Sequence, residues 1–251
     1  MIHRTRIHAA TKAALAHLGL SLLIGLLAAA VVFGLWFPYP YRELAGGLPL
    51  FGILMAVNVV SGPLLTACIF NPQKSRRELT LDLSLIALLQ IAALVYGLYS
   101  ISLARPVALV FEADRMVAVS AASIYPIEEK NLSWTGPVLM GTREPRDGQE
   151  TLESVGLSLQ GIEPSARPGW WQAYAISIPQ VQQKMQPLSP FHNRLTVDRQ
   201  HTLDSAVQKT GLSSDQLYYL PLVAGKNLDS WIVLLNAQAQ IVGFAPLGGF
   251  D

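Results

Sequence analysis

Apolar residues gather in three long runs within the first 104 positions, and short polar segments separate the runs. The helices expected within these runs are about Leu18–Phe37, Leu48–Phe70 and Leu81–Leu103. A helix needs about 20 mostly apolar residues to cross the hydrocarbon core of a bilayer, and each run provides that length. The pattern therefore predicts three membrane-spanning helices in a domain that covers residues 1–104.

The first run is too long for a secretory signal peptide. The apolar part of such a peptide is about 7–15 residues long, whereas the run here extends from Ala13 to Phe37. It ends in an aromatic cluster, Trp36 to Tyr41, that includes two prolines. Aromatic rings of this kind gather where a membrane helix meets the headgroups. We therefore expect this segment to remain in the protein as the first helix.

The basic residues predict how the helices are oriented. Residues 1–12 and the loop 71–80 each carry three Lys or Arg, whereas the loop 38–47 carries one. Cytoplasmic loops are the ones enriched in Lys and Arg. This places the N-terminus in the cytoplasm and everything after Leu103 on the other side, which is the periplasm in a bacterium with two membranes.

The pattern changes after residue 104 to short strands, amphipathic helices and Gly/Pro-rich turns. These alternations predict an α+β extracytoplasmic domain over residues 105–251 that ends in an antiparallel hairpin. Ala113 to Arg115 is the expected turn of a first hairpin. The expected strands are Val107–Glu112, Met116–Ser120, one within 131–146, Leu217–Val223, Ser230–Leu235 and Gln240–Ala245, and the expected helices are Gly148–Gly161, Gln180–Gln186 and Asp198–Gly211.

Composition agrees with a membrane protein and excludes a nucleic-acid-binding one. Apolar residues make up 51% of the chain and charged residues only 14%, against about 25% charged residues in soluble domains. The formal net charge is +1 and no basic stripe follows residue 104, so the electrostatic footprint of a nucleic-acid partner is missing. The single cysteine, Cys68, lies in an apolar run, so we expect no disulfide.

The second and third runs contain two amides and a helix-breaking pair. Pro63 inside a helix releases the carbonyl of Val59 and bends the helix, and Gly62 allows a neighbouring helix to approach closely. Asn58 and Gln90 fall near the bilayer midplane when counted at about 1.5 Å per residue. An amide without a partner is costly there, so the two amides either clasp each other across the helices or grip a polar group of another membrane protein.

Four residues of the α+β domain are candidates for contact with a partner. Asp114 and Arg115 form either an ion pair within their turn or a contact surface. Trp170 and Trp171 follow a Pro-rich loop. Their rings belong to the core, to a protein-binding patch or to a contact with the outer membrane, since Trp is enriched at binding hot spots.

No catalytic or cofactor-binding pattern is found in the sequence. His192, Asp198 and His201 lie close together, but zinc sites need further ligands at defined spacings. G-x-S-x-G and the phosphate-binding G-x-x-x-x-G-K-[ST] are both absent. We expect no enzyme activity, no metal and no cofactor.

Residues 48–120 contain a series of short motifs at defined spacing: Gly62-Pro63-Leu64-Leu65-Thr66, Phe70-Asn71-Pro72, Lys74, Leu81-Asp82-Leu83, Gln90, Tyr96-Gly97, Arg105-Pro106-Val107, Phe111, Asp114 and Arg115. In these motifs the stretch resembles the TfpX/TfpZ (FimB-like) family of type IV pilin accessory proteins. Asn58 departs from the family, which usually carries an acidic residue at this position. A neutral amide there argues against a role in charge or proton transfer. The remainder is similar only as a diverged C-terminal domain.

The resemblance implies an inner-membrane protein that assists the assembly or dynamics of pili made from a cognate pilin. Its helices would contact the transmembrane helix of the pilin, and its outer domain the pilin head or the assembly platform. Small residues suit such close packing. Two alternatives remain, an extracytoplasmic sensor and a membrane-anchored periplasmic hydrolase. The expected contacts in the membrane are Asn58, Ser61, Gly62, Pro63, Thr66 and Gln90, and those outside it are Asp114, Arg115, Trp170 and Trp171.

Overall fold

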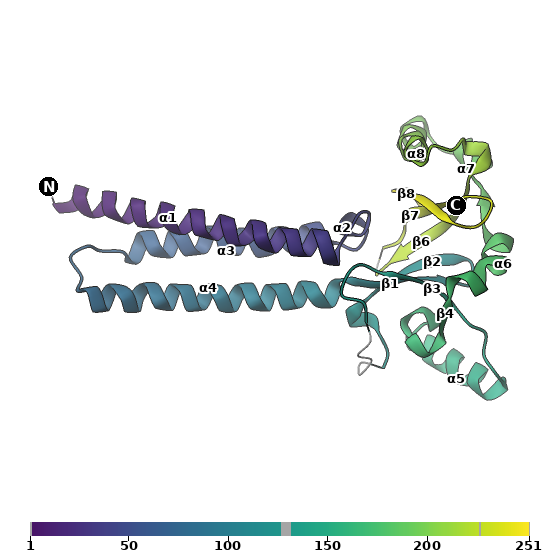
Figure 1. The fold of residues 1–251 in the computed structure, drawn as a ribbon, viewed down its shortest axis with the longest axis horizontal. Coiled ribbons are helices and arrows are strands. Elements are labelled where there is room, and N and C mark those ends of the chain that lie inside the picture. The colour runs from purple at the N-terminus through teal and green to yellow at the C-terminus, as the bar shows by residue number, and fades with distance from the viewer. Residues whose placement is uncertain (1, 127–131, 226, 251) are drawn as a thin grey trace. The chain divides into compact units, whose positions relative to one another are not determined.

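The computed structural model describes the backbone of residues 2–126, 132–225 and 227–250. The chain divides into two compact units, Met1–Ala104 and Arg105–Asp251. The first is helical, and the second combines a sheet with short helices (Figure 1). This is the expected class, a membrane protein with three N-terminal transmembrane helices followed by an α+β domain.

The helical unit contains three helices that are long and apolar enough to cross a membrane. They lie side by side in Figure 1, and the middle helix in sequence, α3, packs against both of the others. The predicted spans are confirmed, although α1 and α4 begin earlier than the apolar runs do. The elements are α1 Ile2–Val31, continued by a π-helical turn Val32–Trp36, then α2 Tyr41–Leu44, α3 Gly47–Ile69 and α4 Arg76–Ala104.

The early start of α4 has a local cause in the sequence Ser75-x-x-Glu78. The backbone N–H of Ser75 donates to the Glu78 carboxylate at 2.9 Å, and the backbone N–H of Glu78 donates to Ser75 Oγ at 3.3 Å. This reciprocal capping box satisfies N–H groups that a helix leaves unpaired at its start. Lys74 then pairs with Asp82 at 2.5 Å and ties the basic loop to the first turns of the helix.

The α+β unit is built on one mixed sheet with strand order β4-β3-β1-β2-β6-β7-β8, and β5 pairs with β6. Strands β1 and β3, and likewise β2 and β6, run parallel, and the other pairs are antiparallel. The strands are β1 Pro106–Glu112, β2 Arg115–Ser120, β3 Val138–Thr142, β4 Trp171–Ala173, β5 Gln186–Pro187, β6 Tyr218–Ala224, β7 Asn227–Leu235 and β8 Ile241–Ala245. The helices of at least five residues are α5 Gly148–Ser158, α6 Tyr174–Lys184, α7 Leu188–His192 and α8 Val197–Thr210.

The first hairpin and the terminal hairpin form as predicted. In the first, Glu112 pairs with Arg115 across a two-residue turn. Ala113 has a φ of 55° there, a left-handed conformation that usually favours glycine in such turns. The turn therefore forms without the glycine that usually signals it.

Helix α8 covers a core made by the C-terminal strands. It ends at Thr210, and the next residue, Gly211, has a φ of 72°, the left-handed conformation expected just past a helix end. Its predicted inner face is buried, and the core continues into α7, β6, β7 and β8. The buried members are Leu188, Phe191, Leu203, Ala206, Val207, Leu217, Tyr219, Ile232, Leu234, Ala245 and Leu247.

Two predicted helices differ from expectation. Helix α6 begins at Tyr174 and not at Gln180, because the Tyr174 hydroxyl donates to the carbonyl of Ala239 at 2.7 Å and holds the first turn against the β7–β8 loop. Helix α5 forms as predicted, but its apolar stripe faces outward. Leu152 and Leu159 are 75% and 85% exposed.

Candidate functional site

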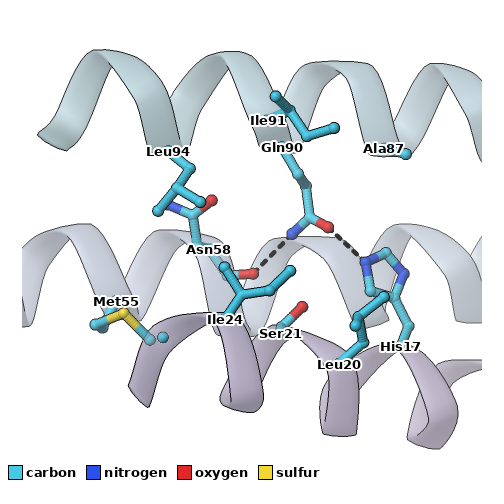
Figure 2. A pocket seen from close by; sticks show the side chains of 11 residues that line it. His17, Leu20, Ser21, Ile24, Met55, Asn58, Ala87, Gln90, Ile91 and Leu94 are labelled. Carbon is cyan, nitrogen blue, oxygen red and sulfur yellow. Dashed lines mark hydrogen bonds between the residues drawn. The ribbon is translucent and has the colours of Figure 1, made fainter. Parts of the chain in front are cut away.

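Four polar residues from the three long helices meet within the apolar helical unit. His17 of α1 bonds through Nδ1 to Thr66 Oγ1 of α3 at 2.7 Å, and through Nε2 to Gln90 Oε1 of α4 at 2.5 Å. Gln90 Nε2 in turn donates to the backbone carbonyl of Asn58 in α3 at 2.7 Å. One continuous chain of hydrogen bonds, which we call the polar chain, therefore links all three helices (Figure 2).

The acceptors in the polar chain determine which group donates each of its hydrogen bonds. A backbone carbonyl only accepts, so the nitrogen of the Gln90 amide faces Asn58 and its oxygen faces His17. That oxygen also only accepts, so His17 carries a proton on Nε2. Every link is thus a donor matched to an acceptor, as burial in hydrocarbon requires.

Gly62 creates the space in which the Gln90 amide lies. A Cβ atom at position 62 would come within 2.1–2.4 Å of the three terminal amide atoms of Gln90, closer than nonbonded atoms approach. Thr66 is buried one turn further along the same face of α3. The spacing Gly62-x-x-x-Thr66 therefore brings α3 close to its neighbours, in the way that small residues do between membrane helices.

A cavity of about 140 Å³ lies beside the polar chain. Its walls come from α1 and α4 and its floor from α3, and we call it the α1–α4 groove (Figure 2). Most of its surface is apolar. Its lining consists of His17, Leu20, Ser21, Ile24, Gly25, Met55, Asn58, Ala87, Gln90, Ile91 and Leu94.

The structure brings together four of the six membrane residues selected from the sequence. Asn58, Gly62, Thr66 and Gln90 all belong to the polar chain or contact it. The predicted clasp between the two amides is corrected in one respect. Gln90 bonds to the backbone carbonyl of Asn58, and the Asn58 side chain donates instead to the carbonyl of Leu54 at 3.0 Å.

The other two, Ser61 and Pro63, lie only partly buried on α3. The Ser61 hydroxyl donates to the carbonyl of Val57, four residues earlier on the same helix, at 2.6 Å. Sequence reasoning missed His17, which joins α1 to both other helices. An imidazole within the first apolar run was the available signal, because ionisable residues inside membrane helices almost always face a partner.

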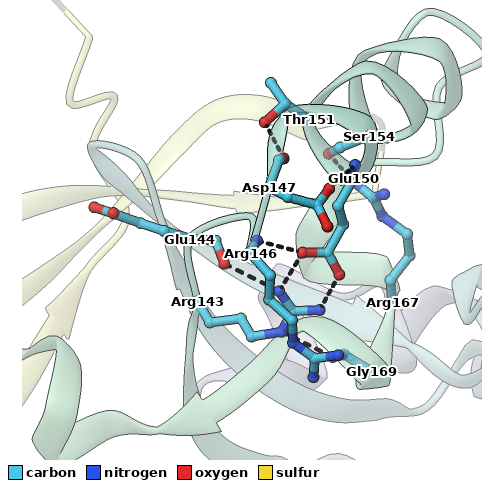
Figure 3. A network of polar contacts seen from close by, with 9 residues as sticks. All are labelled: Arg143, Glu144, Arg146, Asp147, Glu150, Thr151, Ser154, Arg167 and Gly169. Carbon is cyan, nitrogen blue, oxygen red and sulfur yellow. Dashed lines mark hydrogen bonds and ion pairs between the residues drawn. The ribbon is translucent and has the colours of Figure 1, made fainter.

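A second polar network lies in the α+β unit, at the start of α5 (Figure 3). Arg143 makes two bonds to the Glu150 carboxylate, at 2.9 and 2.6 Å. The backbone N–H of Arg146 adds a third bond to it at 2.5 Å. The Arg143 guanidinium, and secondly this N–H, lower the pKa of Glu150 to about 2. The Asp147 side chain caps the helix by accepting from the Glu150 N–H at 2.8 Å.

The two tryptophans have different environments. Two guanidinium groups, those of Arg143 and Arg167, lie over the ring of Trp170, each 4.6 Å from its centroid, an arrangement that stabilises through cation–π attraction. Trp171 packs against a buried core cluster of β1 and β2, and its Nε1 donates to the carbonyl of Ser165 at 2.8 Å. Both rings are half-buried, so the core interpretation applies to Trp171 and only in part to Trp170.

The turn pair and the histidine cluster are also accounted for. Asp114 and Arg115 form the expected ion pair at 2.8 Å and remain largely exposed. His192 pairs with Asp204 at 3.0 Å and not with Asp198. Within the described part of the chain, no group of three metal-ligating side chains is close enough together to hold a metal ion.

Comparison with known proteins gives relatives that match over the whole chain. Two fimbrial assembly proteins of Dichelobacter nodosus, from serogroups I and E1, are 32% and 31% identical over 100% of both chains. A third, from serogroups C1 and C2, is 41% identical over 49% of this chain and 94% of its own. No solved structure matches. The model of the fimbrial assembly protein FimB family matches residues 5–46. Together with the full-length relatives, this match shows that the chain belongs to the FimB family of fimbrial assembly proteins.

Proposed function

We propose that this protein is a non-enzymatic accessory factor of the bacterial inner membrane that assists the assembly or dynamics of type IV pili made from a cognate pilin. The observation that carries the proposal is the full-length similarity to proteins named fimbrial assembly proteins. The three apolar helices supply the membrane anchor that such a role requires. The pilin and the pilus assembly platform are the proposed partners.

The state of the charged side chains favours binding over catalysis. The Arg143 guanidinium is bound to the Glu150 carboxylate and the Lys74 ammonium to Asp82, so these charge pairs are internal to the fold. A general acid or base would instead be directed toward a substrate. The surfaces proposed to meet the partner outside the membrane are the Asp114–Arg115 turn and the neighbourhood of Trp170 and Trp171.

The proposed topology follows the distribution of basic residues, with the N-terminus cytoplasmic and the α+β unit periplasmic. Alkaline phosphatase fused after Ser120 should be active, and β-lactamase fused after Gln73 should not protect cells. An inactive phosphatase fusion would contradict this topology.

Deletion of the gene tests the function itself. We expect fewer surface pili, with total and processed pilin unchanged, because an accessory factor acts after the subunit has been made. Expression of the full-length chain from a plasmid should restore the pili. Normal piliation and twitching in the deletion strain would contradict the proposal.

A further inference from the structure

The α1–α4 groove contains two polar groups that the protein itself does not satisfy. Asn58 is only 9% exposed. Its Nδ2 donates to Leu54, but within the described residues its Oδ1 accepts no hydrogen bond. Ser21 also lines the groove, and its hydroxyl makes no hydrogen bond within that same part of the chain. Figure 2 shows Ser21 pointing from α1 into the space between the helices.

Most other described hydroxyls on the same helices are hydrogen-bonded, whereas Ser21 and the exposed Ser84 of α4 make no hydrogen bond within the described residues. Thr11, Ser61 and Ser100 each donate to the carbonyl four residues before them, at 2.6–2.9 Å. Such a bond satisfies a hydroxyl in hydrocarbon, where a polar group without a partner is costly. The available hydroxyl of Ser21 and the available oxygen of Asn58 therefore indicate that a partner group enters the groove.

We propose that the transmembrane helix of the pilin lies in the α1–α4 groove, and that Ser21 and Asn58 bind a hydrogen-bonding side chain midway along it. This inference rests on the proposed function. The occupant must be helical, because inside the bilayer every backbone polar group has to be paired within its own segment. Its side chain must donate to Asn58 Oδ1, so it carries a hydroxyl, an amide or a protonated carboxyl group.

The shape and chemistry of the groove favour this occupant over two others. A lipid tail offers no donor to Asn58. A second copy of this chain would present the outer faces of its helices, and these are rich in exposed leucine, including Leu23, Leu27, Leu85 and Leu88. A fourth helix placed against α1 and α4 would complete a four-helix bundle and cover the polar chain from the lipid.

Site-specific photo-crosslinking in cells that make the full-length protein tests the position of the pilin. A photoreactive residue at Ala87 or Ile24, which line the groove, should capture pilin. The matched control at Leu85, which is 59% exposed and outside the groove, should not. Capture of a second copy, capture of lipid alone, or equal capture of pilin at Leu85 would overturn the inference.

Ser21→Ala tests the polar contact, and Ser100→Ala is its control. Ser21 makes no hydrogen bond within the described chain, so its loss should leave the folded protein unchanged. We expect about 3- to 20-fold less pilin to co-purify, which corresponds to the loss of one hydrogen bond between membrane helices. Ser100→Ala should leave the yield unchanged. Equal yields for both variants would overturn the role of Ser21.

The two proposals fail in different ways. If pili do not depend on this protein, the proposed function is wrong. If pili depend on it, and pilin is captured elsewhere but not from Ala87 or Ile24, the function stands and the groove is not the binding position.

Discussion

The two units use polar and apolar side chains in opposite ways. In the α+β unit a buried apolar cluster that includes Tyr219, Ile232 and Leu234 forms the core, and the charged network of Arg143 and Glu150 lies near the surface. In the helical unit most large apolar side chains face outward, although a small cluster that includes Phe37, Phe51 and Ile101 is buried, and the polar chain lies inside. Burial of apolar surface drives folding in water, but it provides no such drive between helices in lipid.

The difference indicates where each unit is sensitive to substitution. In the α+β unit the cost of a change should scale with the apolar volume that it removes from the core. In the helical unit it should depend on a few positions, His17, Gly62, Thr66 and Gln90, that allow close approach and satisfy one another's hydrogen bonds.

The largest effect is expected in the core of the α+β unit. Leu234→Ala removes a fully buried side chain and leaves a cavity, so the free energy of unfolding should fall by about 2–5 kcal/mol. The same substitution at Leu152, which is exposed on α5, should change it by less than about 0.5 kcal/mol. Denaturant titration of the purified full-length protein, followed by a spectroscopic signal from the α+β unit, gives the change in the free energy of unfolding for both variants. Similar losses would contradict the placement of the core.

The next effect concerns a single added methyl group in the helical unit. Gly62→Ala would force the Gln90 amide out of its place and break the polar chain, at a cost of about 1–3 kcal/mol. The control is Gly52→Ala on the same helix, where an added Cβ atom would have no neighbour within 4 Å. Thermal unfolding in detergent compares the two. Equal melting temperatures would show that α3 and α4 do not meet at Gly62.

A smaller effect is expected for the hydrogen bonds themselves. Gln90→Leu and His17→Phe each break the polar chain, and each interhelical bond contributes about 0.6–2 kcal/mol. Because both residues share one bond, the double variant should lose less stability than the sum of the single losses. Strictly additive losses in this double-mutant cycle would show that the two side chains are not coupled.

The smallest effect is the acid response of the network in the α+β unit. The folded pKa of Glu150 is about 2, below its ordinary value, so this carboxylate stabilises the folded state above its unfolded pKa. That contribution is lost as the pH falls from about 4.5 toward 2. The fluorescence of Trp170, which stacks on Arg143, should change over this window in the native protein and not in Glu150→Gln. If the fluorescence changed with pH in the same way in both proteins, Glu150 would not be the cause of the change.

Hydropathy along the chain was sufficient to predict the three spans and the shared depth of Asn58 and Gln90, because depth follows from counting residues. It could not predict the rotation of each helix about its axis. That rotation decides whether Gln90 meets the side chain or the backbone of Asn58, and whether His17 points inward. The capping pair Ser75 and Glu78 was a readable signal for the early start of α4.

In the α+β unit, two short β-rich runs around a turn predicted the hairpin at Ala113, and helical periodicity predicted α8, because one face of that helix has to be buried. The same reasoning fails for α5. Its apolar stripe at Leu152 and Leu159 is exposed, and the start of the helix is held by the Asp147 cap and the Arg143–Glu150 pair. A stripe shows that a face is apolar, but not that the fold covers it.

The claim that the helical unit serves pilus assembly through the α1–α4 groove is tested most directly by counting surface pili. The deletion strain would carry the full-length chain, the groove-filling variant Ala87→Phe or the outward-facing variant Leu85→Phe, at equal levels in the membrane. The account predicts few pili with Ala87→Phe and normal numbers with the other two chains. Normal piliation with Ala87→Phe would contradict it.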